Sequence, residues 1–295
     1  MKVLIFGSSG QDGNYLSAYL KGQAIEVIGV SRSGGDMKGS VSDFALVSKL
    51  VRDYQPDFIF HFAAISTTSH NFLFENHEAI STGTLNILEA VRIYSPESKV
   101  FLSGSALQFK NSGLPIDEST AFEASSAYSL ARIHSIYAGR YYRNAFGMRV
   151  YAGYFFNHDS PFRSVQHINQ KIVSVVHRIS KGSNEKLELG NIDVRKEFSY
   201  AVDIVEAVWK LVNQDNIFEA VIGSGKAYSI KEFTNYCFKK VNKNYKDFVI
   251  IKEGFSPEYD VLVSNPRLIS SLGWEPRTDF FQLADLMMDS YDSSH

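Results

Sequence analysis

The chain has 295 residues, with 30 Lys and Arg against 32 Asp and Glu and a net charge of −2. This balance argues against a nucleic-acid binder, which needs clustered positive charge. The single cysteine, Cys237, excludes an internal disulfide, and the eight histidines show no metal-ligand spacing, so no metal is expected. No apolar run approaches the roughly 20 residues that span a bilayer. We therefore expect a soluble, cytoplasmic protein without a membrane or nucleic-acid partner.

Strand and helix patterns alternate from the N-terminus to residue 155. Apolar runs rich in β-branched and aromatic residues predict strands at 2–6, 26–30, 58–64, 99–103 and 148–154. Amphipathic runs predict helices at 14–21, 46–54, 82–94 and 126–144. This alternation predicts an α/β protein with a Rossmann-type, doubly wound parallel sheet.

Beyond residue 156 the regular alternation of strand and helix patterns ends. Helices are expected at 165–180, 199–212, 230–241 and 280–291, and strands at 187–189, 220–222 and 248–251. We expect a cofactor-binding Rossmann domain at 1–160, completed by 197–225. Residues 161–196 and 226–295 are expected to form a smaller substrate-binding cap.

Three glycines follow the first strand with the spacing G-x-x-G-x-x-G. In such a turn the first glycine bends sharply, the second lets the backbone approach a pyrophosphate, and the third lets the helix pack on the sheet. The N-terminus of the helix adds partial positive charge for the phosphates. The pattern predicts a dinucleotide site with contacts from Gly7, Ser9, Gly10, Gln11, Asp12 and Gly13.

The end of the second expected strand indicates which dinucleotide binds. An acidic residue there would bond the ribose hydroxyls of NAD. Here the strand runs into Ser31, Arg32 and Ser33, and no carboxylate follows until Asp36. A cation with flanking hydroxyls suits a 2′-phosphate, although Arg32 could also be a solvated surface residue. We predict NADP.

Tyr128 and Arg132 stand one turn apart on the expected helix 126–144, and Ser105 follows an upstream strand. Here the sequence resembles the extended short-chain dehydrogenase/reductase family over nearly the whole chain. Within that family it is most similar to the GDP-mannose 4,6-dehydratases and the GDP-4-keto-6-deoxymannose reductases. The segments that carry the resemblance, in the expected order, are 10–13, 61–64, 156–161, 189–193, 200–203 and 272–276.

The resemblance implies a role for individual residues. Tyr128 would act as general acid or base, Ser105 would support it with a hydrogen bond, and Arg132 would position the cofactor. Besides Tyr128 and Arg132, further cofactor contacts would come from Ser40, Val41, Phe62, Ala63 and Ala64. Substrate contacts would come from Asn157, Lys171, Arg195, Lys196 and Glu258.

The departures from the family pattern bear on the reaction. Arg132 stands where the family has Lys, and a planar guanidinium is bulkier than an ammonium. The dehydratases place a Glu two residues after the catalytic hydroxyl to remove the proton from sugar carbon 5. That position is Leu107 here, and the adjacent Ala106 offers no base either. Ser256 also replaces an arginine expected at the diphosphate.

These departures favour an NADP(H)-dependent reductase acting at carbon 4 of a GDP-4-keto-6-deoxysugar, because ketone reduction needs no base at carbon 5. The alternative is a true GDP-mannose 4,6-dehydratase. A further alternative is a catalytically eroded protein that binds NADP or a nucleotide sugar without turnover. The resemblance also implies a homodimer or homotetramer, paired through the helices expected at 82–94 and 126–144.

Overall fold

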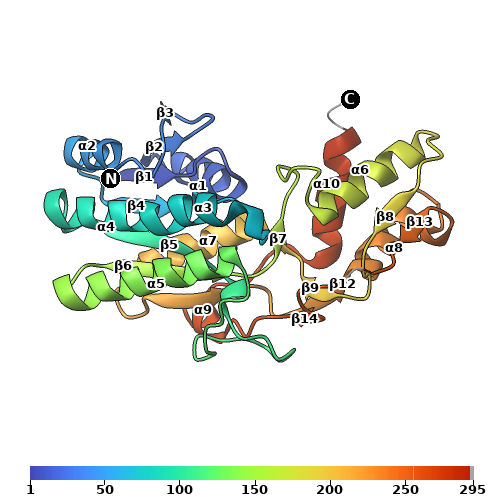
Figure 1. Cartoon of the computed structure of the whole chain (residues 1–295). Coiled ribbons are helices and arrows are strands. Elements are labelled where there is room, and N and C mark those ends of the chain that lie inside the picture. Colours follow the sequence, from blue (N-terminus) through green and yellow to red (C-terminus); the bar gives the residue numbers. More distant parts are fainter. Residues whose placement is uncertain (255, 293–295) are drawn as a thin grey trace.

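The computed structural model describes residues 1–254 and 256–292 (Figure 1). Its centre is a seven-stranded sheet in the order β11-β6-β5-β4-β1-β2-β3, with every neighbouring pair parallel. The strands are β1 (Lys2–Phe6), β2 (Glu26–Ser31), β3 (Met37–Lys38), β4 (Phe58–His61), β5 (Lys99–Ser105), β6 (Val150–Phe155) and β11 (Glu219–Ile222). The predicted doubly wound α/β sheet is confirmed, and its order reverses between β1 and β4.

Helices cover both faces of this sheet. On one face lie α1 (Gln11–Lys21) and α7 (Ala201–Val212), and on the other lie α2 (Phe44–Tyr54), α4 (Gly83–Tyr94) and α5 (Ala127–Phe146). Successive side chains of β1 alternate between the two cores: Leu4 and Phe6 pack toward α2, α4 and α5, whereas Val3 and Ile5 pack toward α1 and α7.

A second group of elements lies beside the carboxyl end of the sheet, at the right of Figure 1. Its helices α6 (Ile168–Ser180), α8 (Ile230–Lys240) and α10 (Phe280–Asp292) share a third apolar core. Its strands are β7 (His158–Asp159), β8 (Leu187–Leu189), β9 (Arg195–Glu197), β10 (Ser199–Tyr200), β12 (Ala227–Ser229), β13 (Val249–Ile251) and β14 (Val261–Leu262). The chain enters this group after β6, returns to the sheet for α7 and β11, and then leaves again. The domain boundaries stay a prediction.

Short helical segments complete the described chain. They are η1 (His70–Phe72), α3 (Leu73–Asn76), η2 (His77–Thr82), η3 (Ala106–Gln108), η4 (Tyr245–Asp247) and α9 (Arg267–Ser271). Among residues 1–254 and 256–292, no helix combines the length and the apolar character that crossing a membrane requires.

Two boundaries differ from the sequence-based expectation in ways that shape the site. Helix α1 begins at Gln11, three residues earlier than predicted, because Gly10 already serves as its N-cap. Helix α6 begins at Ile168 instead of residue 165, with His167 as its N-cap. The first shift places Gln11 and Asp12 on a helical turn, and the second leaves residues 160–167 in the loop between β7 and α6.

Candidate active site

A cavity of about 380 Å³ opens where the sheet order reverses, between the carboxyl ends of β1 and β4. We call it the Gly7 cavity. Ligands of open α/β sheets bind at such a reversal. The predicted cofactor residues that line it are Gly7, Gly10, Ser31, Arg32, Ser33, Ser40, Val41, Phe62, Ala63 and Ala64.

The glycines leave room for a pyrophosphate in this cavity. Gly7 has a φ of +88°, and a Cβ there would lie 2.6 Å from the backbone nitrogen of Ala63. Gly13 does not line the cavity but packs its Cα against the backbone of Gly7 and Ser8. With the N-terminus of α1 directed at the same space, the residues present fit a dinucleotide cofactor.

One of the residues that line the Gly7 cavity, Arg32, carries a positive charge that can bind a phosphate. Arg32 is exposed at the rim and has no hydrogen bond or ion pair to another described residue. The nearest downstream carboxylate, Asp36, accepts the backbone N–H of Gly29 at 2.8 Å and does not line the cavity. The Ser31 hydroxyl bonds the backbone of Gly34, so Arg32 is the stronger phosphate ligand here.

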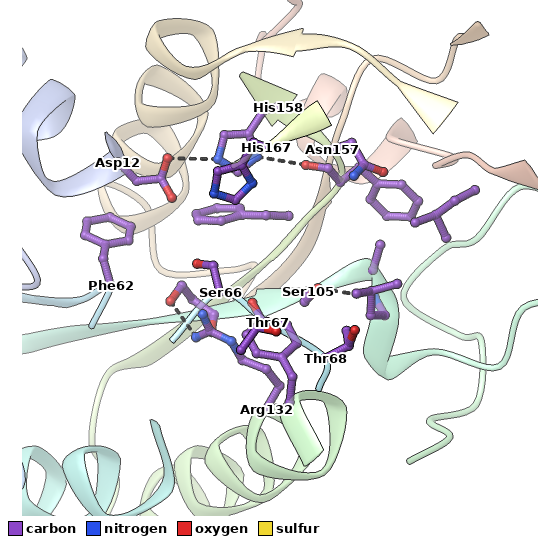
Figure 2. A pocket seen from close by; sticks show the side chains of 18 of the residues that line it. Asp12, Phe62, Ser66, Thr67, Thr68, Ser105, Arg132, Asn157, His158 and His167 are labelled. Carbon is purple, nitrogen blue, oxygen red and sulfur yellow. Dashed lines mark hydrogen bonds and ion pairs between the residues drawn. The ribbon is translucent and has the colours of Figure 1, made fainter. Parts of the chain in front are cut away.

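Gln11 and Asp12 were predicted as cofactor contacts, but their side chains bond Ser160 and His158, in and just after strand β7. The Asp12 carboxylate pairs with His158 Nε2 at 2.8 Å, and Gln11 Oε1 accepts the Ser160 hydroxyl at 2.8 Å (Figure 2). Neither residue lines the Gly7 cavity. Ser9 also lies outside its lining, with its hydroxyl 3.5 Å from that of Ser33.

His158 is held as an imidazolium. Its Nδ1 lies 2.8 Å from the Phe156 carbonyl and its Nε2 2.8 Å from Asp12, and both partners can only accept, so both ring nitrogens must donate. Burial alone would lower the pKa of His158, but Asp12 outweighs it and raises that pKa above its ordinary value of 6.5. Burial would raise the pKa of Asp12, yet His158 and Arg163 hold it well below its usual range.

A second cavity of about 370 Å³ adjoins the first, and Phe62 lines both. We call it the Tyr128 cavity. Figure 2 shows its labelled residues, with Ser105 and Arg132 on the sheet side and Asn157, His158 and His167 on the opposite side. Its lining comprises Asp12, Phe62, Ser66, Thr67, Thr68, Ser103, Gly104, Ser105, Ala106, Leu107, Tyr128, Arg132, Phe155, Phe156, Asn157, His158, Arg163, His167 and Leu262.

The three predicted catalytic residues meet in the Tyr128 cavity. Ser105 ends β5 and accepts the N–H of Leu107 at 3.2 Å, which leaves its hydroxyl proton free for a ligand. Tyr128 lies on the first turn of α5, and the Arg132 guanidinium is 5.1 Å from the centre of its ring.

Arg132 is buried beneath the tyrosine. Its Nη1 donates to the Ser103 carbonyl and, at 2.7 Å, to the Ser103 hydroxyl, while its Nε has no partner. Burial and this cation lower the pKa of the neighbouring His61 to about 4. Arg132 lines the Tyr128 cavity and not the Gly7 cavity, so its predicted contact with the cofactor would be made from the side of Tyr128.

The predicted substrate residues are dispersed. Asn157 lines the Tyr128 cavity, and Glu258 accepts the hydroxyl of Thr68 at its edge. Lys171 donates to the Glu188 carbonyl at 2.7 Å, and Arg195 pairs with Glu232 at 3.1 Å. Lys196 is buried, with its ammonium 5.1 Å from the ring of Phe198. These three cations line neither cavity.

The sequence analysis did not predict several residues that line the Tyr128 cavity. Ser66, Thr67 and Thr68 follow β4, where polar residues after a parallel strand could have been noticed. Arg163 and His167 come from the loop before α6, and His167 was expected to lie inside the helix at 165–180. Among the described residues that line the Tyr128 cavity, Asp12 supplies the one carboxylate, and it is paired with His158.

A family model described as GDP-mannose 4,6 dehydratase matches residues 4–287. The chain belongs to this family. GDP-mannose 4,6 dehydratase 1 of Arabidopsis thaliana is 30% identical, and the match covers 97% of this chain and 88% of that protein. The GDP-mannose 4,6 dehydratase of Homo sapiens is 29% identical, and the match covers 82% of this chain and 72% of that protein.

Solved structures show the same fold. The dTDP-glucose 4,6-dehydratase from Bacillus anthracis in complex with NAD has a TM-score of 0.88 at 17% identity, covering 99% of this chain and 97% of that chain. RMD from Pseudomonas aeruginosa complexed with NADPH also has a TM-score of 0.88, at 18% identity, covering 100% and 99%. The predicted membership of the extended short-chain dehydrogenase/reductases is confirmed, and the chain is an enzyme of that class. The neighbours hold both nicotinamide cofactors, so they leave the choice between NAD and NADP open.

We expect Asp12→Asn to destabilise the protein by about 3 kcal/mol, because it leaves the buried His158 without its partner in a largely buried ion pair. The raised pKa of His158 gives stability that is full below 6.5 and is lost as the pH rises through the folded-state pKa. The lowered pKa of Asp12 gives stability that is present above 3.8 and is lost as the pH falls. The difference from wild type should therefore be largest between pH 3.8 and 6.5.

Urea unfolding at a series of pH values measures this difference. Asp53→Asn is the matched control, because Asp53 pairs with Lys49 on the exposed face of α2, and its effect should be small at every pH. Equal pH profiles for wild type and Asp12→Asn would contradict the assignment of a charged pair.

Proposed function

We propose that this enzyme uses NADP to convert a GDP-linked hexose, GDP-mannose in the first instance, to its 4-keto-6-deoxy product by loss of water. The observation that carries the proposal is the match of the dehydratase family model from residue 4 to residue 287. The curated relatives named above carry the same activity in their names and align over most of their length. They favour the dehydratase over the reductase.

The arrangement of Tyr128 and Ser105 supports chemistry at a sugar hydroxyl. NADP bound in the Gly7 cavity would supply a hydride acceptor beside the Tyr128 cavity. Tyr128 would take the proton from the hydroxyl at carbon 4 as that carbon is oxidised, and the free proton of Ser105 would bond the same oxygen. Arg132 would hold the Tyr128 ring in place from below.

A reductase acting at carbon 4 of a GDP-4-keto-6-deoxysugar is the second candidate. One observation favours it: neither Ala106 nor Leu107 can remove a proton, and both line the cavity beside Ser105. Reduction of a ketone would need Tyr128 as an acid and no base at carbon 5.

Product analysis by mass distinguishes the two candidates. Purified protein is incubated with GDP-mannose and NADP, and separately with GDP-4-keto-6-deoxymannose and NADPH. The proposal expects GDP-mannose to lose the mass of one water without added NADPH. Gain of two hydrogens by the keto sugar, with GDP-mannose unchanged, would instead establish the reductase.

Tyr128→Phe tests the proton transfer. The substitution keeps the ring above Arg132 but removes the hydroxyl, so we expect turnover to fall by at least about 100-fold. Binding of GDP, measured by calorimetry, should be retained. Tyr19→Phe is the control, because Tyr19 is half-buried on α1 and lines neither cavity. Near-normal turnover in Tyr128→Phe would rule out Tyr128 as the acid or base.

Arg32→Ala tests the choice of NADP. Loss of one charge-assisted hydrogen bond, roughly 1.5–3 kcal/mol, should weaken NADP binding about 10- to 100-fold and leave NAD binding nearly unchanged. Fluorescence titration with NADPH and NADH measures both. Lys38→Ala, an exposed cation of β3 outside the cavity lining, should alter neither affinity. Equal losses for both cofactors would argue against a 2′-phosphate contact.

A homodimer paired through α4 and α5 is part of the proposal. Large apolar side chains are exposed on these adjacent helices, which suits burial against a second copy. They are Leu85 and Ile93 on α4 and Leu130, Tyr137, Tyr141 and Phe146 on α5.

A further inference from the structure

Among the described residues of the Tyr128 cavity, no carboxylate stands beside Ser105, and the imidazole of His167 has no assigned role. The carboxylate of Glu258 accepts the Thr68 hydroxyl at the edge of the cavity and lies outside its lining. Asp12 and His158 neutralise each other, and both nitrogens of His158 are already hydrogen-bonded. Arg132 and Arg163 are cations, which cannot accept a proton. Among the described titratable residues that line the cavity, this leaves Tyr128, which has its own role, and His167.

His167 is placed to act on a ligand in this cavity. It precedes α6 as the N-cap residue, but its side chain makes no capping hydrogen bond. No other described residue hydrogen-bonds its ring, and the residue is half-buried. Figure 2 shows the ring on the side of the cavity that faces Ser105 and Arg132. A sugar held between these walls would therefore meet Tyr128 and Ser105 on one side and His167 on the other.

The surroundings of His167 keep its ring neutral. Burial lowers the pKa of His167, and the positive N-terminus of α6 acts in the same direction. The charged and titratable groups that face it are Arg163, Lys196 and His158, which lower the pKa, and Asp159, which raises it. A neutral imidazole with a free nitrogen is a general base at pH 7.

We propose that His167 is the base that removes the proton from sugar carbon 5, in place of the missing carboxylate. The proposal rests on the dehydratase function proposed above. A ketone at carbon 4 makes the hydrogen at carbon 5 acidic, because the electron pair left behind is delocalised onto the ketone oxygen. An imidazole nitrogen of His167 takes this proton, and the C–H electron pair becomes the double bond between carbons 5 and 6.

The same residue completes the elimination. As the double bond forms, the bond from carbon 6 to its oxygen breaks and the oxygen takes that electron pair. The imidazolium of His167 returns its proton to this oxygen, which leaves as water. No oxidant or reductant is consumed in this step, and His167 ends in its starting state.

Hydrogen exchange at carbon 5 tests the proposal without depending on turnover. The enzyme with NADP is incubated with GDP-4-keto-6-deoxymannose in D₂O, and deuterium at carbon 5 is followed by NMR against a buffer blank. We expect wild type to exchange this hydrogen, and His167→Gln to exchange it about 100-fold more slowly. His70→Gln is the control, because His70 is exposed and outside the cavity lining. Binding of GDP to each variant confirms that it is folded.

Two further measurements separate a chemical role from a structural one. The wild-type exchange rate should rise with pH through a midpoint below 6.5, as His167 loses its proton, and the midpoint should vanish in His167→Gln. Imidazole added to His167→Ala should restore exchange.

Folded His167→Gln that exchanges at the wild-type rate would overturn this inference while leaving the dehydratase proposal intact. Wild type that neither exchanges carbon 5 above the blank nor dehydrates GDP-mannose would overturn both.

Discussion

The buried ion pair between Asp12 and His158 joins the two parts of the site. Asp12 belongs to the first turn of α1 and lines the Tyr128 cavity, and His158 belongs to the short strand β7, which follows β6. Ser160 bonds Gln11 beside it, so two side-chain contacts fix the distance between the glycine turn and this loop. Asn157, next to His158, therefore lies at a fixed place in the Tyr128 cavity. Phe62 lines both cavities, so the Gly7 cavity and the Tyr128 cavity meet at this residue.

The same pair shows what the sequence can and cannot predict. The strand, the glycine turn and the helix are local patterns in the sequence. They predicted the bounds of β1 and the glycine turn that lines the Gly7 cavity. The partner of Asp12 lies 146 residues away, and no local pattern indicates that contact. The pattern assigned Asp12 to the cofactor, whereas in the fold its side chain bonds His158 and lines the Tyr128 cavity. His167 was likewise expected inside a helix, because the apolar period of α6 does not reveal where its first turn begins.

The replacement of lysine by Arg132 has a local physical basis. The guanidinium is long enough to reach the Ser103 carbonyl and hydroxyl at the end of β5, so its charge is partly satisfied in a buried position. Burial, together with this cation, lowers the pKa of His61 and keeps that ring neutral, which avoids a second buried charge next to Arg132. The ring of Tyr128 rests against this cation. Arg132 thus packs against the ring of Tyr128 and holds it in place, and its own buried Nε has no hydrogen-bond partner among the described residues.

The proposed base, His167, lies across the Tyr128 cavity from Ser105, beside which the described lining residues provide no carboxylate. A carboxylate beside Ser105 would place the base and the tyrosine on the same wall, whereas His167 approaches the sugar from the loop before α6. Arg163 is in the same loop and pairs with Asp159, so the position of the base depends on how that loop is held. The ion pair of Asp12 with His158 anchors β7, which precedes the loop, and α6 follows the end of the loop. The proposed proton removal by His167 therefore depends on the contact between Asp12 and His158, and not on β5 alone.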